Sequence, residues 1–270
     1  MSVNLASLYA RQYADTVTLL LQQQGSRLRK AVMEGGHKGE QASPVDQIGS
    51  VEMQSVAGRF APIGRVDAGV DRRWVFPTSF DLPQLVDHFD ELRMIVDPKG
   101  KYVQNGVNAA GRRMDRTIIA KAFATNYTGK DGGTSTAFPS STSTNTVAVN
   151  FGSASDVGMT VAKLREALRM LRTANVDLEA DPLYCAAGAT QLDNLLAEVQ
   201  VVSADYNGDK PVLTDGMIRR FLGFNFIHTE LAVESLSSGD AQIPCWAKSG
   251  LYLGIWEDQK KDISRRNDLS

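Results

Sequence analysis

The sequence has few cysteines and lacks any long apolar run, and each shortage excludes a class of protein. Its 270 residues include two cysteines, Cys185 and Cys245, which stand far apart in the chain and outside any CxxC spacing. This pattern indicates neither a zinc site nor a disulfide framework, and it favours free thiols in a reducing compartment. No stretch approaches the ~20 apolar residues that span a bilayer. Residues 1–30 lack a basic leader and an uninterrupted apolar core, so we expect a cytoplasmic protein without a membrane partner.

A marked excess of either charge is also missing. Lysine and arginine number 29 against 31 aspartates and glutamates, which argues against the uniform coating of nucleic acid that a strongly basic protein achieves. Hydrophobic residues make up 43% and charged residues 22%, values typical of soluble globular proteins. A chain of this length can bury roughly 75% of its unfolded surface, so one large domain or two modest ones are expected.

Motifs for nucleotide binding and catalysis are absent as well. The pair Gly129 and Lys130 fails the P-loop pattern, because Ala124 stands where the first glycine is needed and Asp131 where Ser or Thr is needed. No serine lies within a GxSxG motif, the nucleophile elbow of many hydrolases. The sequence therefore favours a protein that is not an enzyme and has no cofactor.

Metal binding has one weak candidate. The segment DHFDE (87–91) clusters three carboxylates with His88, but no second group of ligands follows at a recognisable spacing, so a solvated helix face is the simpler interpretation. His37 and His228 are isolated in the sequence. Cys185 lies in an apolar segment and is expected in the core. No metal site is predicted.

Periodicity predicts a mixture of helices and strands. Helices are expected at 5–31, 81–92, about 105–127, 160–176, 189–199 and 214–223. The helix at 81–92 would begin at Asp81, and the one at 105–127 would be capped by Gly129. Strands are expected at 72–76, 146–151, 182–188, 224–232 and 247–258, and residues 260–270 form a polar tail.

Residues 34–70 predict a long two-stranded ribbon without a core of its own. The segment is rich in glycine and alternates polar with apolar residues, as in SVEMQSV. It offers nine large apolar side chains: Val45, Ile48, Val51, Met53, Val56, Phe60, Ile63, Val66 and Val70. An isolated hairpin is marginal in water, so something outside the ribbon must stabilise it.

Two groups of residues are candidate contact sites. One helix has a local excess of three positive charges, from Arg112, Arg113, Arg116 and Lys121 against Asp115. This face is either solvated or paired, or it contacts nucleic acid or a neighbouring chain. Base-specific reading is not expected, because no recognition motif is present. At the root of the ribbon, Arg72 and Arg73 precede Trp74, a candidate anchor between subunits.

The order of these elements resembles the major capsid proteins of tailed bacteriophages, which have the α+β Hong Kong 97 fold. Three blocks carry the resemblance: DPKGKYVQNGVNAAGRRMDRTIIAKAF (97–123), AFPSSTSTNTVAVNFGSASDVGMTVAKLREALRMLRTANVD (137–177), and MIRRFLGFNFIHTE (217–230) with AKSGLYLGIWEDQKKDISRRND (247–268). The resemblance implies an N-terminal arm at 1–33, an E-loop at 34–80, a P-domain with a spine helix at 81–154, an A-domain at 155–230, and a return strand with a C-terminal tail at 231–270.

The resemblance also implies a structural role in the virion. The chain would assemble with itself in the host cytoplasm into hexameric and pentameric capsomers of an icosahedral head, which encloses double-stranded DNA without sequence specificity. A separate scaffolding protein is expected, because the chain is too short for a cleaved scaffolding domain; a portal and a decoration protein are further expected partners. Three alternatives stay open: an encapsulin-like compartment for protein cargo, a small enzyme that uses the DHFDE carboxylates, and a tail or head-completion protein.

Overall fold

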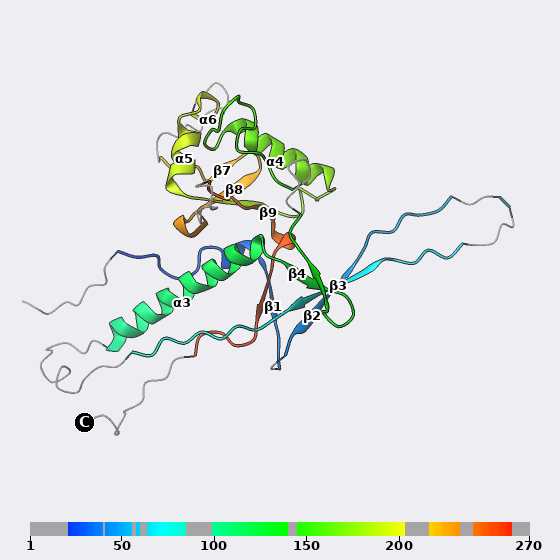
Figure 1. Ribbon diagram of the computed structural model, residues 1–270, viewed down its shortest axis with the longest axis horizontal. Helices are drawn as coiled ribbons and strands as arrows, with labels where there is room; N and C mark the ends of the chain where they lie inside the picture. The colour runs from blue at the N-terminus through cyan, green and yellow to red at the C-terminus, as the bar shows by residue number, and fades with distance from the viewer. Residues whose placement is uncertain are drawn as a thin grey trace, which may run out of the picture.

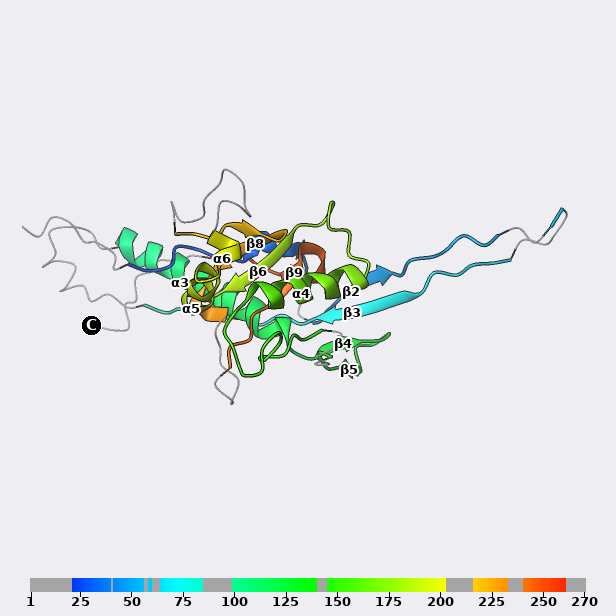
Figure 2. The same cartoon turned by 90° about the horizontal axis from the view of Figure 1, so that it is seen from above.

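The computed structural model describes residues 21–39, 41–55, 58–59, 64–84, 99–139, 145–202, 216–232 and 240–260. In these ranges a long helix, α3 (Lys99–Ala122), lies below a compact region of helices and sheet. A narrow ribbon of two chain segments projects away from both (Figure 1). The view from above shows the same ribbon reaching far beyond the rest of the molecule (Figure 2). The fold is α+β, as the sequence predicts.

Helix α3 spans 24 residues and confirms the predicted long helix with shifted bounds. Its C-terminal half buries Ile118 and Ile119, in line with their three- and four-residue spacing to earlier apolar positions. The helix ends at Ala122 instead of near Tyr127, because residues 126–128 form strand β4. Gly129 has a positive φ of 90°, but it serves the turn after β4 and is not the helix cap.

The ribbon is built on β2 (Ser43–Ile48) and β3 (Val70–Val75), which pair in antiparallel register. Strands β4 (Asn126–Thr128) and β5 (Thr134–Thr136) extend this sheet in the order β2-β3-β4-β5. Beyond it, the amide of Gly49 donates to the carbonyl of Gly69 at 2.7 Å. The predicted ribbon is therefore confirmed where 43–49 pairs with 69–75. Its first part is wrong, because β1 (Met33–Gly36) pairs in parallel with β10 (Tyr252–Ile255).

The compact region is a four-stranded sheet with helices, ordered β7-β8-β6-β9. Its strands are β6 (Leu183–Ala187), β7 (Arg220–Phe221), β8 (Phe224–His228) and β9 (Cys245–Ala247). β6 and β8 run parallel, while β6 and β9 run antiparallel. The helices are α4 (Val161–Thr173), α5 (Ala189–Leu196) and α6 (Val199–Val202). Thr160 caps α4, since its hydroxyl accepts from the amide of Lys163.

The core of this region matches the apolar stripes of its sequence. Phe224 and Cys185 from the sheet are fully buried, as are Leu195 and Val201. Leu164 on α4 is 1% exposed, and Val161 and Leu168 lie on the same face. The predicted helix at 160–176 and the predicted strand at 182–188 are thus confirmed in their central parts, and the predicted strand at 224–232 is confirmed in its first five residues.

A second, smaller core joins the N-terminal segment to α3 and the sheet. It contains Leu28, Ala31, Val32, Ile118, Ile119, Ala186 and Trp246. The indole Nε1 of Trp246 donates to the carbonyl of Ala31 at 2.9 Å. Ala31 belongs to a short 3-10 turn, η1 (Arg29–Ala31). Four segments distant in sequence therefore share one hydrophobic centre.

Several predicted elements are wrong in the described ranges. Residues 21–28 are not helical, because Gly25 adopts a φ of 67° that an α-helix does not allow; residues 5–20 lie outside the described ranges. The segment 146–151 forms turns instead of a strand, with Gly152 at φ 80°. The predicted helix at 214–223 is replaced by β7 and a tight turn at Leu222 and Gly223, both at positive φ.

Two further predicted elements need amendment. Residues 81–84 are not helical, and the remainder of the predicted helix at 81–92 lies outside the described residues. The predicted strand at 247–258 divides into the 3-10 turn η4 (Lys248–Gly250) and β10. Likewise, β8 is followed by a 3-10 turn, η3 (Glu230–Ala232), so the strand ends before Thr229.

Candidate assembly interface

The ribbon exposes apolar side chains that a single subunit leaves uncovered. Ile48 and Val70 are 77% and 70% exposed, and Met53 is fully exposed. Val51 and Val66 are also exposed. Large apolar residues contribute about 1.5–3 kcal/mol each when they are fully buried. Their concentration on one projecting ribbon marks it as a surface that gains stability when another chain covers it.

At the root of the ribbon, Arg72 pairs with Asp46 on the opposite strand. The guanidinium Nε and Nη2 lie 2.5 and 3.0 Å from the two carboxylate oxygens. The hydrogen bond lowers the pKa of Asp46 and raises the pKa of Arg72. Arg73 lies 3.5 Å from Asp71. Both candidate arginines therefore pair within the ribbon of their own chain.

Trp74, the candidate anchor, is held by the β4–β5 turn of its own chain. Its indole Nε1 donates to the carbonyl of Gly129 at 2.8 Å. Gly132 has a φ of 72°, and a Cβ there would stand 3.0 Å from the indole ring. The turn thus needs glycine for both its conformation and its close approach. Contact between Trp74 and a neighbouring subunit stays a prediction.

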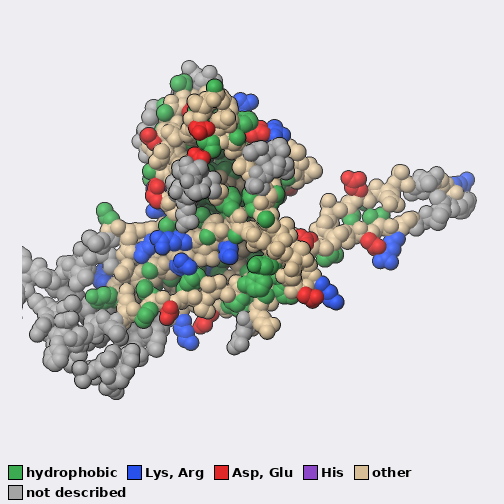
Figure 3. All heavy atoms as spheres, viewed as in Figure 1, with side chains coloured by type: hydrophobic (Ala, Val, Ile, Leu, Met, Phe, Trp, Pro, Cys, Tyr) green, Lys and Arg blue, Asp and Glu red, His purple; other side chains and the backbone are tan. Residues whose placement is uncertain are grey.

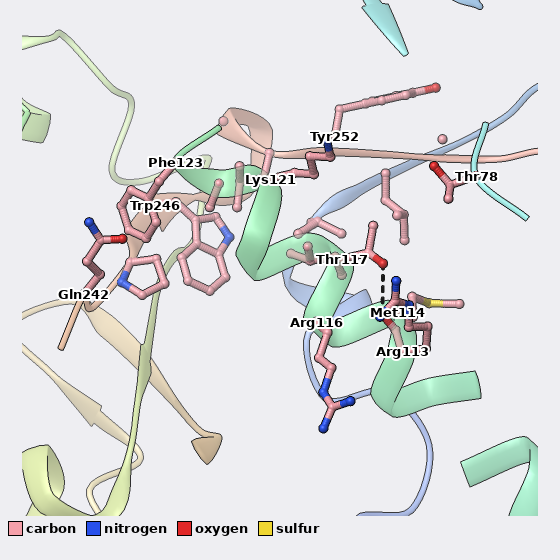
Figure 4. A pocket seen from close by; sticks show the side chains of 18 of the residues that line it. Thr78, Arg113, Met114, Arg116, Thr117, Lys121, Phe123, Gln242, Trp246 and Tyr252 are labelled. Atoms are coloured by element: carbon pink, nitrogen blue, oxygen red, sulfur yellow. Dashed lines mark hydrogen bonds between the residues drawn. The ribbon is translucent and has the colours of Figure 1, made fainter. Parts of the chain in front are cut away.

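A wide cleft of about 4010 Å³ separates α3 from the segment after β3 and from β10. Its walls carry half-exposed aromatic residues, Phe76, Phe80 and Tyr127. Figure 4 shows Arg113, Thr117 and Lys121 of α3 on one side, with Trp246 and Tyr252 from the C-terminal strands nearby. The cleft combines apolar area with basic groups, and its size suits a segment of polypeptide better than a small ligand.

The three candidate arginines of α3 have different surroundings. Arg112 donates to the side chain of Gln22 at 2.6 Å and to the carbonyl of Gln23 at 3.2 Å. The guanidinium of Arg113 lies 4.1 Å from the centre of the Phe80 ring, a cation–π contact. Arg116 is exposed, and no described residue forms a hydrogen bond or ion pair with it.

The space-filling view shows where the basic side chains gather. Blue side chains gather over α3 on the face shown in Figure 3, between the compact region and the lower edge. Arg112 is bonded to the N-terminal segment and Arg113 lies over Phe80, so Arg116 is the arginine of these three whose guanidinium contacts no partner among the described residues. The sequence places all three on one helix but does not distinguish them.

Asp115 is a functional residue that sequence reasoning missed. Its carboxylate is fully buried and accepts hydrogen bonds from the side chains of Gln23 and Ser26. The backbone amides of Arg27 and Leu28 donate to it at 3.0 and 3.2 Å. The available signal was its position: Asp115 lies three and four residues before Ile118 and Ile119, so it faces the core and needs internal donors.

The two histidines that stand isolated in the sequence are not isolated in the structure. His37 Nδ1 lies 2.7 Å from the Ser43 hydroxyl, and Nε2 lies 2.8 Å from the Tyr252 hydroxyl. Its ring stacks on Trp256 with centroids 4.8 Å apart. His37 therefore connects the ribbon root to the C-terminal strand.

His228 belongs to a separate polar cluster. Its Nε2 lies 3.0 Å from Glu230 Oε1, which also accepts from the amide of Ala189 at 2.7 Å. These contacts, the backbone one first, lower the pKa of Glu230. Arg27 donates to the His228 carbonyl at 2.6 Å. The cluster connects the start of α5 to the N-terminal segment.

Within the described ranges, no group of three or more His, Cys, Asp or Glu side chains is placed to hold a metal ion. None of the helices in those ranges combines the length and apolar character needed to cross a bilayer. The DHFDE segment lies outside the described residues.

The chain is similar to a known family in sequence and to solved structures in fold. A family model described as phage capsid protein matches residues 5–270. No curated protein matches the sequence. Among solved structures, the Mycobacterium phage Che8 structure has a TM-score of 0.57 at 14% identity, covering 95% of this chain and 86% of the other.

Two further capsid structures show the same fold at low identity. The capsid of cyanophage P-SCSP1u has a TM-score of 0.55 at 14% identity, covering 89% of this chain and 74% of that one. The mature capsid of bacteriophage PhiM1 has a TM-score of 0.56 at 10% identity, covering 87% and 75%. Such low identities relate the folds and carry no residue roles.

Proposed function

Because this chain belongs to the phage capsid protein family, we propose that it is the major coat protein of a phage head. Copies of it form hexamers and pentamers, and these close an icosahedral shell around double-stranded DNA. In this proposal the segments divide as in the Hong Kong 97 fold, with an arm at 1–33, an E-loop at 34–80, a P-domain at 81–154 and an A-domain at 155–230.

The observation that carries the proposal is the exposed ribbon. A two-stranded ribbon is marginal in water, yet this one projects with Ile48, Met53 and Val70 largely uncovered. A neighbouring copy that covers these side chains supplies the apolar burial that the subunit lacks. Each contact is modest, but a closed shell repeats it in every subunit, so the container is stable.

The cleft beside α3 is the surface we assign to the neighbour's ribbon. It offers aromatic side chains, Phe76, Phe80 and Tyr127, to apolar groups. We expect the root of the ribbon to be rigid, since Arg72 pairs with Asp46 and Trp74 bonds to Gly129. A rigid root lets the ribbon present its apolar residues at a fixed angle, which lowers the entropy lost on binding.

Contact with packaged DNA is assigned to Arg116. Its exposed guanidinium meets phosphates without base reading, so the interaction is sensitive to salt and insensitive to sequence. A separate scaffolding protein, a portal and a decoration protein complete the proposed set of partners, and assembly takes place in the host cytoplasm. We assign no enzymatic activity and no cofactor to the chain.

The test compares two neighbouring substitutions in the ribbon, Met53→Asp and Gln54→Asp. Both side chains are exposed in the subunit, so both variants should fold with unchanged thermal unfolding. Met53→Asp places a charge where the neighbour packs and should abolish shells in negative-stain electron microscopy. Gln54→Asp introduces the same charge one position on and should still assemble. Normal shells from Met53→Asp would refute the assignment of the ribbon.

Nucleic acid recovered from native particles separates the proposal from its rivals. A phage head should contain double-stranded DNA, and Arg116→Glu should still form shells but release DNA at lower salt. Protein cargo without DNA would indicate an encapsulin-like compartment. Rings or tubes would indicate a tail or head-completion protein, and a monomer by light scattering, with an activity lost on Asp90→Ala, would indicate an enzyme.

A further inference from the structure

The only two cysteines of the chain, which are 60 residues apart, meet inside the compact region. Cys185 on β6 and Cys245 on β9 are direct partners in the antiparallel register. Their Sγ atoms lie 3.4 Å apart, and both thiols are free. The thiols are free, as the sequence predicts, but their separation in the chain gives no sign of this contact.

The local backbone favours a covalent link between them. The amide of Ala186 donates to the carbonyl of Pro244 at 3.1 Å, which makes the cysteines a non-hydrogen-bonded pair. Opposed residues at such positions have Cα atoms about 4.5 Å apart. Disulfides span Cα separations of roughly 4.4–6.8 Å. The strands therefore already hold the cysteines within reach of a bond.

We propose that Cys185 and Cys245 are a latent disulfide site, reduced while the chain folds and oxidised once the particle is outside the cell. The formation of a disulfide is inferred from the geometry of the pair. The inference that oxidation follows release of a virion rests on the proposed function. Virion surfaces belong to the oxidising environments in which disulfides persist, whereas the cytoplasm keeps thiols reduced.

The oxidation needs a small-molecule disulfide, RSSR, as electron acceptor. The partly exposed Cys245 reacts first, because Cys185 is fully buried. The Cys245 thiolate attacks one sulfur of RSSR and displaces RS⁻. Cys185 then loses its proton and attacks Cys245 Sγ, displacing the second RS⁻. Two thiols are oxidised to one disulfide, and RSSR is reduced to two RSH.

The order of attack agrees with the electrostatics of the pair. The contact with the Cys245 thiol, followed by burial, raises the pKa of the Cys185 thiol. Cys185 is therefore a poor first nucleophile in water. It becomes reactive toward Cys245 once a mixed disulfide places an electrophilic sulfur directly beside it.

The bond would fasten β9 to the strand that forms the centre of the sheet. β9 leads through η4 into β10, which pairs with β1 of the N-terminal segment. The closed loop contains α5, α6, β7 and β8. Cross-linking a loop of this length restricts the unfolded chain, so the oxidised protein should unfold at a higher temperature.

The experiment treats the folded full-length chain with oxidised glutathione under native conditions, and then blocks and counts remaining thiols by mass spectrometry. We expect a loss of two hydrogens per chain, a cross-linked peptide containing both cysteines, and a higher Tm that dithiothreitol reverses. Persistence of both free thiols, or glutathione held on Cys245 alone, would overturn the proposal. So would a disulfide that forms only in denaturant.

Two variants serve as controls for the shift in Tm. Cys185→Ala and Cys245→Ala should each show no rise in Tm with oxidant. A rise in either variant as large as that of the wild type would contradict the mechanism. The wild-type mass measurement stands even if a variant folds poorly. Because the subunit is used unassembled, failure to form shells would count against the capsid proposal and leave the thiol result readable.

Discussion

The backbone amide of Arg27 donates to the buried carboxylate of Asp115, with 3.0 Å between nitrogen and Oδ2. This contact joins residues 88 positions apart and fixes the N-terminal segment on helix α3. Leu28, the next residue, contributes a second amide to the same carboxylate and buries its side chain fully in the small core. One side chain of α3 thus holds two consecutive backbone amides of the segment.

Replacing Asp115 by alanine should strongly destabilise the subunit. Two backbone amides and the hydroxyl of Ser26 would lose their acceptor in a buried site, and each unsatisfied buried group costs about 1–3 kcal/mol. We expect a loss of about 3 kcal/mol in the free energy of unfolding, measured by urea denaturation. Arg116→Ala on the same helix is the control and should change stability by less than about 0.5 kcal/mol.

Gly111→Ala should displace the N-terminal segment from α3. A Cβ at residue 111 would overlap the backbone of Gly25, which crosses the helix there. We expect a cost of about 1–3 kcal/mol from overpacking, with faster proteolysis near residue 25. The matched control is Gly100→Ala in the same helix, where a Cβ meets nothing within 4 Å. That change should stabilise the subunit by about 0.5–1 kcal/mol. Equal effects of the two substitutions on stability would contradict the crossing of Gly25 over α3.

Ile118→Asp should prevent stable folding, because it places a charge in the core shared by α3, the N-terminal segment and Trp246. The cost of an unpaired buried charge exceeds the destabilisation that single substitutions usually cause. We therefore expect the free energy of unfolding to fall by more than about 4 kcal/mol. Ala120→Asp puts the same charge on the exposed side of α3. Circular dichroism should show folded protein for Ala120→Asp alone; a folded, soluble Ile118→Asp would mean that this stripe is not core.

The contact of Glu230 with the start of α5 predicts a pH-dependent contribution to stability. Hydrogen bonds from Ala189 and His228 hold the pKa of Glu230 below its ordinary value of 4.5. A carboxylate whose pKa is lower in the folded than in the unfolded protein stabilises the fold at pH values above its unfolded pKa. This contribution is lost as the pH falls through the folded pKa. Wild type should therefore exceed Glu230→Gln in stability near pH 7, and the difference should vanish in acid.

The control for this prediction is Glu179→Gln, an exposed position on the loop after α4. Unfolding free energies of the three proteins, followed from about pH 7 to about pH 3, provide the measurement. A wild-type advantage over Glu230→Gln that grows on acidification would show that the contact with Ala189 is not the source of the stabilisation.

Local sequence determined the elements in which apolar residues recur at a regular spacing. Val161, Leu164 and Leu168 recur at helical spacing and predict α4, while the apolar run around Cys185 predicts β6. The scarcity of apolar residues at 34–70 predicts a ribbon that needs outside support. Such patterns state which face is buried, because side-chain direction follows directly from the period of a helix or strand.

Tertiary structure decided what those faces meet. The sequence cannot show that Gly25 crosses Gly111, that Asp115 finds its donors at Ser26 and Arg27, or that Cys185 faces Cys245. Each of these pairs is brought together by chain segments 60 to 89 residues apart, and local propensity carries no information about such distances. The N-terminal segment meets α3 because the small core excludes water only when all of its contributors pack at once, and the cysteines meet because β6 pairs with β9.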